Sequence, residues 1–413
     1  MSAEELLIDA DGHVLEPPNL WKEYLEPKYR DRAVNIRPGA DGFEFLEIDG
    51  KPSALTSSSL LNSLGGMGKL QKLGDKVQEA NQQTRAAMLA SFMSSKGDVK
   101  RFAAGAQITL RPEDTYLAGF APGAMDVKER LEILDREGMA KAILYPTLGL
   151  LWEAEMFDIE LAGAHCRAYN RWIAEFCSAS GGRLVPIAHL SLGDPEEAAR
   201  ELRRAVKDGC KGAFVAPYTL TRKPHGHFDH DPVFATAQDL DVPIGIHPGL
   251  EPINWSIHNR FDGIEWADWY FFLYAAQGVQ HAFGTLFQYG VFDRFPRLRT
   301  VVLESGAGWI GYWIDRADAI YKRTSIGGTV QLKEAPSYYF KRQCYISADP
   351  DERSIEAMTR LVGEDRFFWA SDYPHPDHPG NYLEELRGLV AGMTTTARRG
   401  VLGENVARCY KLL

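Results

Sequence analysis

The stretch RLVPIAHLSLGDPEEAARELRRAVKDGCKGAFVAP, residues 183–217, contains one complete strand–helix–strand unit. Its two ends, residues 183–190 and 212–217, are short apolar runs that predict buried strands. Between them, Asp194 is placed to cap a helix, a proline follows at the first helical position, and Gly209 comes after the last turn. Because parallel sheets are built from strands joined by such helices, the stretch predicts an α/β fold.

The same alternation of apolar runs and helical segments continues along the chain. Eight runs predict strands, at residues 6–11, 141–146, 183–190, 212–217, 242–247, 300–304, 344–348 and 367–372. Eight parallel strands that are each followed by a helix form a (β/α)₈ TIM barrel, which typically takes about 250 residues. Since the chain has 413 residues, we predict a single barrel domain over residues 1–413 with a long insertion after the first strand, at about residues 33–122. Such an insertion would form a lid or an oligomer contact.

Composition excludes several classes of protein. Hydrophobic residues make up 45% and charged residues 25% of the chain, which is typical of a folded globular protein. The net charge of −10 and the lack of a basic run argue against a nucleic-acid partner. We also find no signal peptide and no apolar stretch long enough to cross a membrane, so we expect a cytoplasmic protein. The five cysteines are widely spaced, which favours reduced thiols over disulfides or a thiolate zinc site.

Polar side chains stand where several predicted strands end, which is where a barrel of this type carries its chemistry. The first run ends with Asp11, and His13 follows two residues later, so a period of two places both on one side of the strand. The fifth run ends with His247 and the eighth with Asp372. Each residue alone has a structural alternative, as a hydrogen-bonded core histidine or a loop-capping aspartate. Together, two carboxylates and two imidazoles predict a site for Zn²⁺, Mn²⁺ or Fe²⁺, because such groups are costly to bury unless they are paired or bound to metal.

Three further residues are candidates for the same site. Glu304 ends the sixth run and could act as a general acid or base, bind a second metal together with His281, or pair with an arginine. His281 or His375 could contact the substrate, and His375 could instead orient a metal ligand. The residue pattern leaves these roles open, as well as the number of metal ions, one or two per chain.

A long connection after the fifth run, residues 249–280, is rich in aromatic side chains. We expect it to form an apolar wall of the pocket, although a buried helix face or a subunit contact would need the same composition. The aromatic residues concerned are Trp255, Phe261, Trp266, Trp269, Tyr270, Phe271, Phe272 and Tyr274.

Over nearly its whole length the chain resembles the amidohydrolase superfamily. It is most similar to the amidohydrolase-related branch, which includes aminocarboxymuconate-semialdehyde decarboxylase and the resorcylate decarboxylases. The resemblance implies that Asp11, His13, His247 and Asp372 bind the metal and that the protein is a homo-oligomer, a dimer. The segments that carry it are IDADGHVLEP (8–17), YPTLG (145–149), IHPG (246–249), GVFDRFPRLR (290–299), LESGAGW (303–309) and ASDYPHP (370–376).

Two departures from the branch shape the functional prediction. Asp11 replaces the leading histidine of the family's His-x-His motif, which shifts the preference from Zn²⁺ toward Mn²⁺ or Fe²⁺. Glu304 stands where the decarboxylases carry a catalytic histidine, and a carboxylate beside a metal suits the activation of water.

We therefore predict a metal-dependent hydrolase that cleaves an amide, ester or related carbonyl bond of a small organic substrate. In this prediction Glu304 assists proton transfer, Asp372 has a catalytic as well as a ligating role, and His281 or His375 contacts the substrate. The first alternative is a non-oxidative decarboxylase of an aromatic or unsaturated carboxylic acid. Two others are a binuclear iron enzyme and a non-catalytic partner subunit.

Overall fold

The computed structural model describes most of the chain. The described residues are 5–56, 121–256, 276–323, 332–375 and 382–413, together with 61, 64, 113, 115–118, 273 and 274. Much of the expected insertion at 33–122 lies outside them. So does the part of the aromatic connection that holds all its named aromatic residues except Trp255 and Tyr274.

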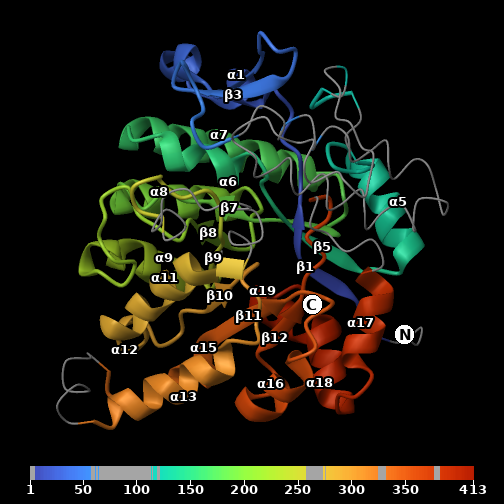
Figure 1. The fold of residues 1–413 in the computed structure, drawn as a ribbon, viewed down its shortest axis with the longest axis vertical. Helices are drawn as coiled ribbons and strands as arrows, with labels where there is room; N and C mark the ends of the chain where they lie inside the picture. The colour runs from blue at the N-terminus through green and yellow to red at the C-terminus, as the bar shows by residue number, and fades with distance from the viewer. Residues whose placement is uncertain are drawn as a thin grey trace.

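Parallel strands form the predicted (β/α)₈ barrel at the centre of the molecule (Figure 1). They pair in two groups, in the orders β1-β5-β6 and β12-β11-β10-β9-β8-β7. The predicted third strand is divided into β6 and β7 on either side of Ile187. The strand bounds are β1 Ile8–His13, β5 Lys141–Tyr145, β6 Leu184–Pro186, β7 Ala188–His189, β8 Ala213–Val215, β9 Ile244–Ile246, β10 Thr300–Val302, β11 Cys344–Ala348 and β12 Phe367–Trp369.

Backbone hydrogen bonds join the first strand to the segment that follows the last one. The amide of Asp372 donates to the carbonyl of Asp11 over 2.9 Å, and the amide of His13 donates to the carbonyl of Tyr373 over 2.7 Å. These bonds bring the carboxyl ends of β1 and β12 together, although His13 and Asp372 are 359 positions apart in the sequence.

Alternate residues of the strands fill the barrel interior. Ile8 and Ala10 of β1 lie there with Phe214 of β8 and Tyr345 of β11, in a cluster of buried side chains distinct from the larger core between strands and helices. Helix α19 (Asn405–Tyr410) lies at the amino-terminal end, where a Cβ on Gly212, which precedes β8, would come within 3.1 Å of the Tyr410 ring. The hydroxyl of Tyr410 extends to that of Tyr145, with 2.8 Å between their oxygens. The opposite, carboxyl-terminal end is therefore the open end of the barrel.

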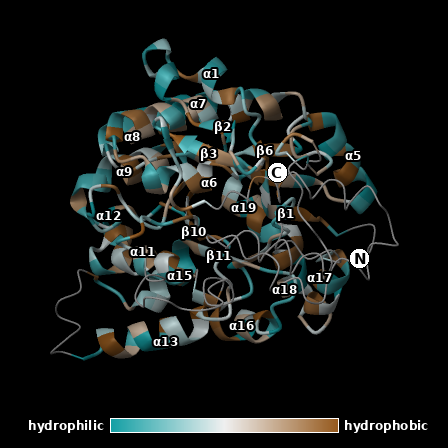
Figure 2. Cartoon of the chain, turned by 45° about the horizontal axis from the view of Figure 1, so that its top comes forward, coloured by the Kyte–Doolittle hydropathy of each residue, from teal (hydrophilic) through white to brown (hydrophobic). Residues whose placement is uncertain are grey.

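Helices surround the strands, and hydrophilic and hydrophobic residues alternate along them (Figure 2). The predicted cap at Asp194 is confirmed, because its side chain accepts from the amide of Glu197, and Asp126 caps α5 in the same way by accepting from the amide of Glu129. The helix bounds are α5 Val127–Glu137, α6 Gly149–Trp152, α7 Ile159–Ser178, α8 Pro195–Lys207, α9 Asp231–Leu240, α11 Ala276–Gln288, α12 Val291–Arg294, α13 Ile310–Tyr321, α15 Pro336–Gln343, α16 Ile355–Val362, α17 Tyr382–Val390 and α18 Thr395–Arg399.

The described start of the insertion is a small antiparallel sheet beside α7 (Figure 1). Helix α1 (Leu20–Tyr24) and a short 3₁₀ helix (Pro27–Arg32) lead into it. Arg32 pairs with Asp49 in the turn between β3 and β4 and with Asp158 at the start of α7, which ties this part of the insertion to the barrel. The strands of the sheet are β2 Asn35–Pro38, β3 Glu44–Ile48 and β4 Lys51–Pro52.

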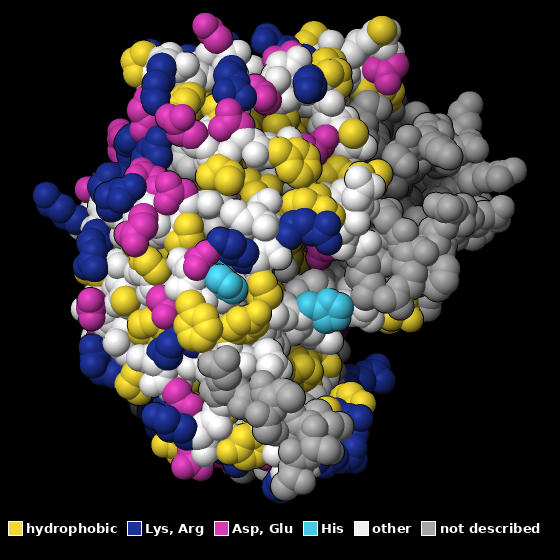
Figure 3. All heavy atoms as spheres, turned by 90° about the vertical axis from the view of Figure 1, so that its left-hand side faces the viewer, with side chains coloured by type: hydrophobic (Ala, Val, Ile, Leu, Met, Phe, Trp, Pro, Cys, Tyr) yellow, Lys and Arg dark blue, Asp and Glu magenta, His cyan; other side chains and the backbone are white. Residues whose placement is uncertain are grey.

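Two further expectations can be compared with the structure. All five cysteines are buried and free of disulfides, as predicted. Within the described residues, none of the helices has the length and apolar character needed to cross a bilayer. On the face drawn in Figure 3, acidic and basic side chains are intermixed. Among the ion pairs, Arg204 of α8 contacts Glu201 on the same helix and Asp208, which follows it.

Candidate metal centre

The four predicted ligands meet at the carboxyl end of the barrel. His13 Nε2 lies 2.9 Å from Asp372 Oδ1 and 3.6 Å from Asp11 Oδ1, and His247 Nε2 lies 3.5 Å from the same Asp11 oxygen. All four residues are buried. The structure thus brings together side chains from the first, fifth and eighth strands of the barrel, which are β1, β9 and β12.

An irregularity in β1 helps to place two of these side chains. The pairing of β1 with β5 shifts between Asp9 and Gly12, so that one more residue is accommodated in β1 than in its partner. Such a bulge re-aims the side chains that follow it. Asp11 and His13 consequently reach the site from a bulged strand rather than from the regular alternation that the sequence suggested.

Backbone carbonyls determine which nitrogen of each histidine faces the site. His13 Nδ1 lies 2.8 Å from the carbonyl oxygen of Pro146, and His247 Nδ1 lies 2.7 Å from that of Pro248. A carbonyl only accepts, so each Nδ1 carries a proton and donates it. In the neutral rings Nε2 is then a bare nitrogen, the form that binds a metal.

The atoms that converge here lack ordinary hydrogen bonds. Both carboxylate oxygens of Asp11 and of Asp372, and Nε2 of His13 and His247, are buried without a hydrogen-bond partner in the described part of the chain. Unsatisfied buried polar atoms are costly, and a cluster of them with N and O donors fits a divalent cation. The residues present therefore suit the metal that the sequence predicts.

The charge states of these side chains agree with that fit. Burial alone would raise the pKa of Asp372, but His375 and His13 beside it lower that pKa well below its usual range. Burial lowers the pKa of His13. An ionised carboxylate and a neutral imidazole are the states in which these groups bind metals.

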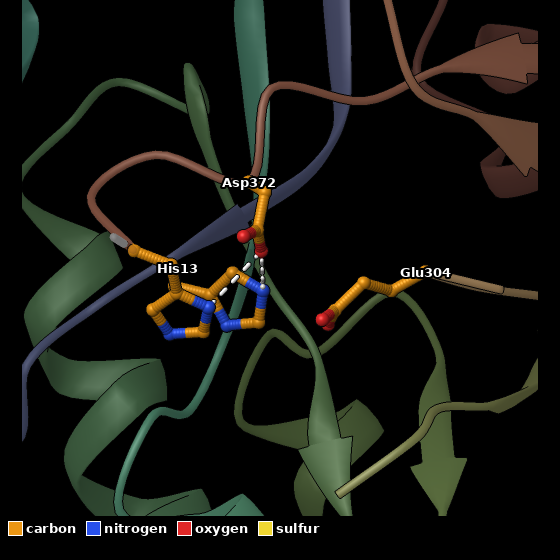
Figure 4. A group of neighbouring side chains, drawn as sticks. His13, Glu304 and Asp372 are labelled. Carbon is orange, nitrogen blue, oxygen red and sulfur yellow. Dashed lines mark ion pairs between the residues drawn. The ribbon is translucent and has the colours of Figure 1, made fainter. Parts of the chain in front are cut away.

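Glu304 and His375 complete the cluster. Glu304 Oε2 lies 3.3 Å from His247 Nε2, and the side chain is 27% exposed, so it can meet a bound molecule. Figure 4 shows the carboxylates of Glu304 and Asp372 directed toward the ring of His13. His375 stacks on His13 with 3.8 Å between ring centroids. Potential ligand atoms form two sets, each within 4.8 Å: one from His13, Glu304, Asp372 and His375, the other from Asp11, His13 and His247.

Two of these carboxylates stand on strained backbone. Glu304 has φ of 36° and Asp372 has φ of 56°, values in the left-handed region that residues with a side chain seldom adopt. Strain of this kind persists where the surrounding structure holds it, and it clusters at functional sites.

His281 is not brought to the cluster. It lies on α11 with an exposed side chain and belongs to neither set of ligand atoms. The helical position of this histidine explains the difference, because strand ends converge in a barrel whereas the outer helices point their polar residues in many directions.

Beneath the ligands lies a layer of buried, hydrogen-bonded side chains, Asp9 and Arg130, that the sequence did not predict. Asp9 accepts hydrogen bonds from the amide and the hydroxyl of Ser371, over 2.9 and 2.7 Å. Arg130 of α5 donates to the carbonyl oxygens of His13 and Tyr373, over 3.1 and 3.3 Å. Asp9 is visible beside Asp11 in the sequence, but an arginine within an amphipathic helix gives no signal that it is buried.

Asp349 is another residue that the sequence analysis missed. It directly follows β11. In the sheet, β11 lies between β10, which precedes Glu304, and β12, which precedes Asp372. Burial and the charges of Glu352 and Asp372 raise the pKa of Asp349 to about 8. Its position at the end of the seventh strand is the signal that would have identified it.

Glu251, four residues after His247 in the sequence, gives a pH-dependent prediction. Burial against α11, where a Cβ on Gly278 would overlap its carboxylate, raises the pKa of Glu251 to about 7. An unfolded glutamate titrates near 4.3, so the folded state holds the proton more tightly and the free energy of unfolding falls as pH rises from about 4 to 7. Glu251→Gln should reduce the difference in unfolding free energy between pH 4 and pH 8 by about 1–3 kcal/mol in urea titrations.

The matched control for this prediction is Glu196→Gln, which changes an exposed glutamate on α8. That variant should keep the pH dependence of the parent protein. Equal pH dependence in the parent and in Glu251→Gln would contradict the prediction.

Comparison with known proteins places this geometry in context. A sequence model of the family described as Amidohydrolase matches residues 131–412. A gamma-resorcylate decarboxylase from Polaromonas is 28% identical over 297 residues, which cover 66% of this chain and 88% of the relative.

Solved structures share the fold over nearly the whole chain. An amidohydrolase from Mycobacterium avium subsp. paratuberculosis superposes with a TM-score of 0.74 at 19% identity, covering 98% of this chain and 99% of that one. A 5-carboxyvanillate decarboxylase from Novosphingobium aromaticivorans, in complex with manganese and 4-hydroxy-3-methoxy-5-nitrobenzoic acid, gives 0.63 at 18% identity, covering 99% and 97%.

These relatives correct the functional prediction. The hydrolase expected from Glu304 is wrong, because gamma-resorcylate decarboxylases match the chain over most of its length. The findings favour the alternative of a non-oxidative decarboxylase. The substitution of glutamate for histidine after the sixth strand does not by itself define the reaction.

Proposed function

The chain belongs to the amidohydrolase family, and from this premise we propose that it is a metal-dependent, non-oxidative decarboxylase of a small aromatic carboxylic acid. The observation that carries the proposal is the convergence of Asp11, His13, His247 and Asp372 on one buried point at the barrel mouth. The decarboxylase relatives support the reaction type.

We propose Mn²⁺ as the metal, held by these four residues. Two carboxylates and two imidazoles form a donor set rich in oxygen, which suits Mn²⁺ better than a set of nitrogen and sulfur ligands would. The decarboxylase from Novosphingobium was crystallised with manganese. When bound, the ion would supply positive charge for the oxygens of an aromatic acid and so hold its carboxylate in a fixed orientation.

The protein side chains would then manage one proton. In the proposed reaction a proton is transferred to the ring carbon that bears the carboxylate, a C–H bond forms, and the C–C bond to the carboxylate breaks. Its electron pair restores the aromatic ring, and CO₂ leaves. We assign the proton transfer to Glu304, whose partly exposed carboxyl faces the cluster, with water returning the proton afterwards.

The test uses the full-length protein loaded with Mn²⁺. Incubation with 2,6-dihydroxybenzoate or 5-carboxyvanillate should release one CO₂ for each acid consumed, without uptake of O₂. In D₂O the product should gain one deuterium at the vacated carbon. Release of no CO₂ from any of a panel of hydroxybenzoates would contradict the proposal, and consumption of O₂ with turnover would favour the iron enzyme instead.

Glu304 has its own variant in this experiment. Glu304→Gln should lower kcat by about 10²–10⁴-fold, because the amide cannot supply the proton. Glu334→Gln, which changes an exposed glutamate before α15, is the control and should turn over at the parent rate. Light scattering of the same samples would show the dimer that we propose from the family resemblance.

A further inference from the structure

His375 lies against two of the proposed ligands. Its Nδ1 is 3.1 Å from Asp372 Oδ1, and the same carboxylate oxygen is 2.9 Å from His13 Nε2. The rings of His13 and His375 stack at 24° to each other. Two imidazole nitrogens therefore face one buried carboxylate oxygen.

The hydroxyl of Thr147 determines which nitrogen of His375 carries a proton. Thr147 Oγ1 is 2.7 Å from the carbonyl oxygen of Val14, which can only accept, so the single hydroxyl proton is donated there. The same oxygen is 2.8 Å from His375 Nε2 and must accept from it. His375 therefore carries its proton on Nε2, and in the neutral ring Nδ1 is bare.

The bare Nδ1 needs a cation beside it. His13 donates from Nδ1 to Pro146, so its Nε2 is bare as well, and both nitrogens face the carboxylate of Asp372. Lone pairs on three adjacent atoms repel one another unless a proton or a metal ion lies between them. A metal ion satisfies all three atoms without that repulsion.

We propose that His375 is a further protein ligand of the metal, through Nδ1, and that Thr147 is the positioning residue that presents this nitrogen. The cluster of His13, Glu304, Asp372 and His375 within 4.8 Å supplies the geometry. The inference rests on the metal centre of the proposed function and is independent of the reaction that the centre catalyses.

The loop that carries Thr147 is itself held rigidly. The buried carboxylate of Glu16 accepts hydrogen bonds from the amides of Thr147, Leu148 and Gly149, over 3.1, 2.8 and 2.8 Å. The carbonyl of Pro146, next to Thr147, accepts from His13 Nδ1. One anchored segment after β5 thus determines the protonated nitrogen of both stacked histidines.

The number of coordinated imidazoles is the direct test. Pulsed electron paramagnetic resonance of the Mn²⁺-loaded full chain counts histidine nitrogens bound to the ion, whether or not the protein turns over any substrate. The expected result is three in the parent protein, from His13, His247 and His375, and two in His375→Ala. Two in both proteins would overturn the proposal, and so would three in both.

Thr147 is tested by Mn²⁺ affinity, measured by competition with a chelator. Thr147→Val removes the hydroxyl and should weaken Mn²⁺ binding by about 10–100-fold, the usual cost of losing a group that orients a ligand. Thr147→Ser keeps the hydroxyl and should restore the parent affinity. Parent-like affinity in a folded Thr147→Val protein, shown by an unchanged circular dichroism spectrum, would overturn the positioning role. So would equal weakening in Thr147→Ser.

Discussion

A protein in which asparagine replaces Asp372 should bind Mn²⁺ at least about 100-fold more weakly and lose almost all turnover. Asp372 Oδ1 is the atom that both His13 Nε2 and His375 Nδ1 approach within 3.1 Å. The amide removes the negative charge at the point where the cation is expected and places either an oxygen or an NH₂ group between two bare nitrogens. Elemental analysis after dialysis and the rate of CO₂ release measure the two effects separately.

The experiment has a matched control, and its possible outcomes can be told apart. Asp315→Asn, at an exposed position on α13, is the control and should retain both metal and turnover. If Asp372→Asn keeps its metal but loses turnover, Asp372 acts in catalysis as well as in binding. Unchanged turnover in a metal-loaded Asp372→Asn protein would remove Asp372 from the site.

Replacing Arg130 with methionine should destabilise the fold by about 3–5 kcal/mol, the cost of breaking a buried charged network. Arg130 is 2% exposed and its two donors serve the carbonyls of His13 and Tyr373. Methionine fills a similar volume but removes both donors, which leaves the carbonyl of Tyr373 with the amide of His13 as its donor. Burial raises the pKa of Asp9 to about 6 against the lowering effect of Arg130, so the variant also leaves this carboxylate without its nearby cation.

Arg136 provides the matched control on the same helix. Its side chain is 67% exposed and pairs with Glu137, so Arg136→Met should change the unfolding free energy by less than about 1 kcal/mol. Urea unfolding of the two variants and the parent protein is the measurement. Equal stability of Arg130→Met and Arg136→Met would mean that the layer beneath the ligands contributes little.

The sequence predicted the strands and helix ends of the barrel because these depend on neighbouring residues. Asp126 and Asp194 cap their helices through amides three residues away, a relation that is legible in one stretch of chain. The division of the third strand at Ile187 and the bulge near Gly12 were not predicted. Both depend on the partner strand, which the local pattern does not contain.

Local sequence patterns are limited in the same way for the candidate site. Asp11, His13, His247, Glu304, Asp372 and His375 could be proposed as neighbours because a barrel brings its strand ends together. Arg130 and Thr147 act across more than 100 residues of sequence, through contacts that no spacing encodes. The reaction was misjudged for a different reason: a carboxylate beside a metal can serve hydrolysis or decarboxylation, and the position of the substrate decides between them.

The hydrogen bonds between Asp9 and Ser371 have a consequence for how the protein is made. These residues are 362 positions apart, and the ligands at residues 11, 13 and 372 assemble around them. At about 5–20 residues per second, a ribosome needs roughly 20–70 s to pass from the first ligands to the last. During that interval the nascent chain carries an incomplete set of ligands, and the full set can form only after the final strand has emerged.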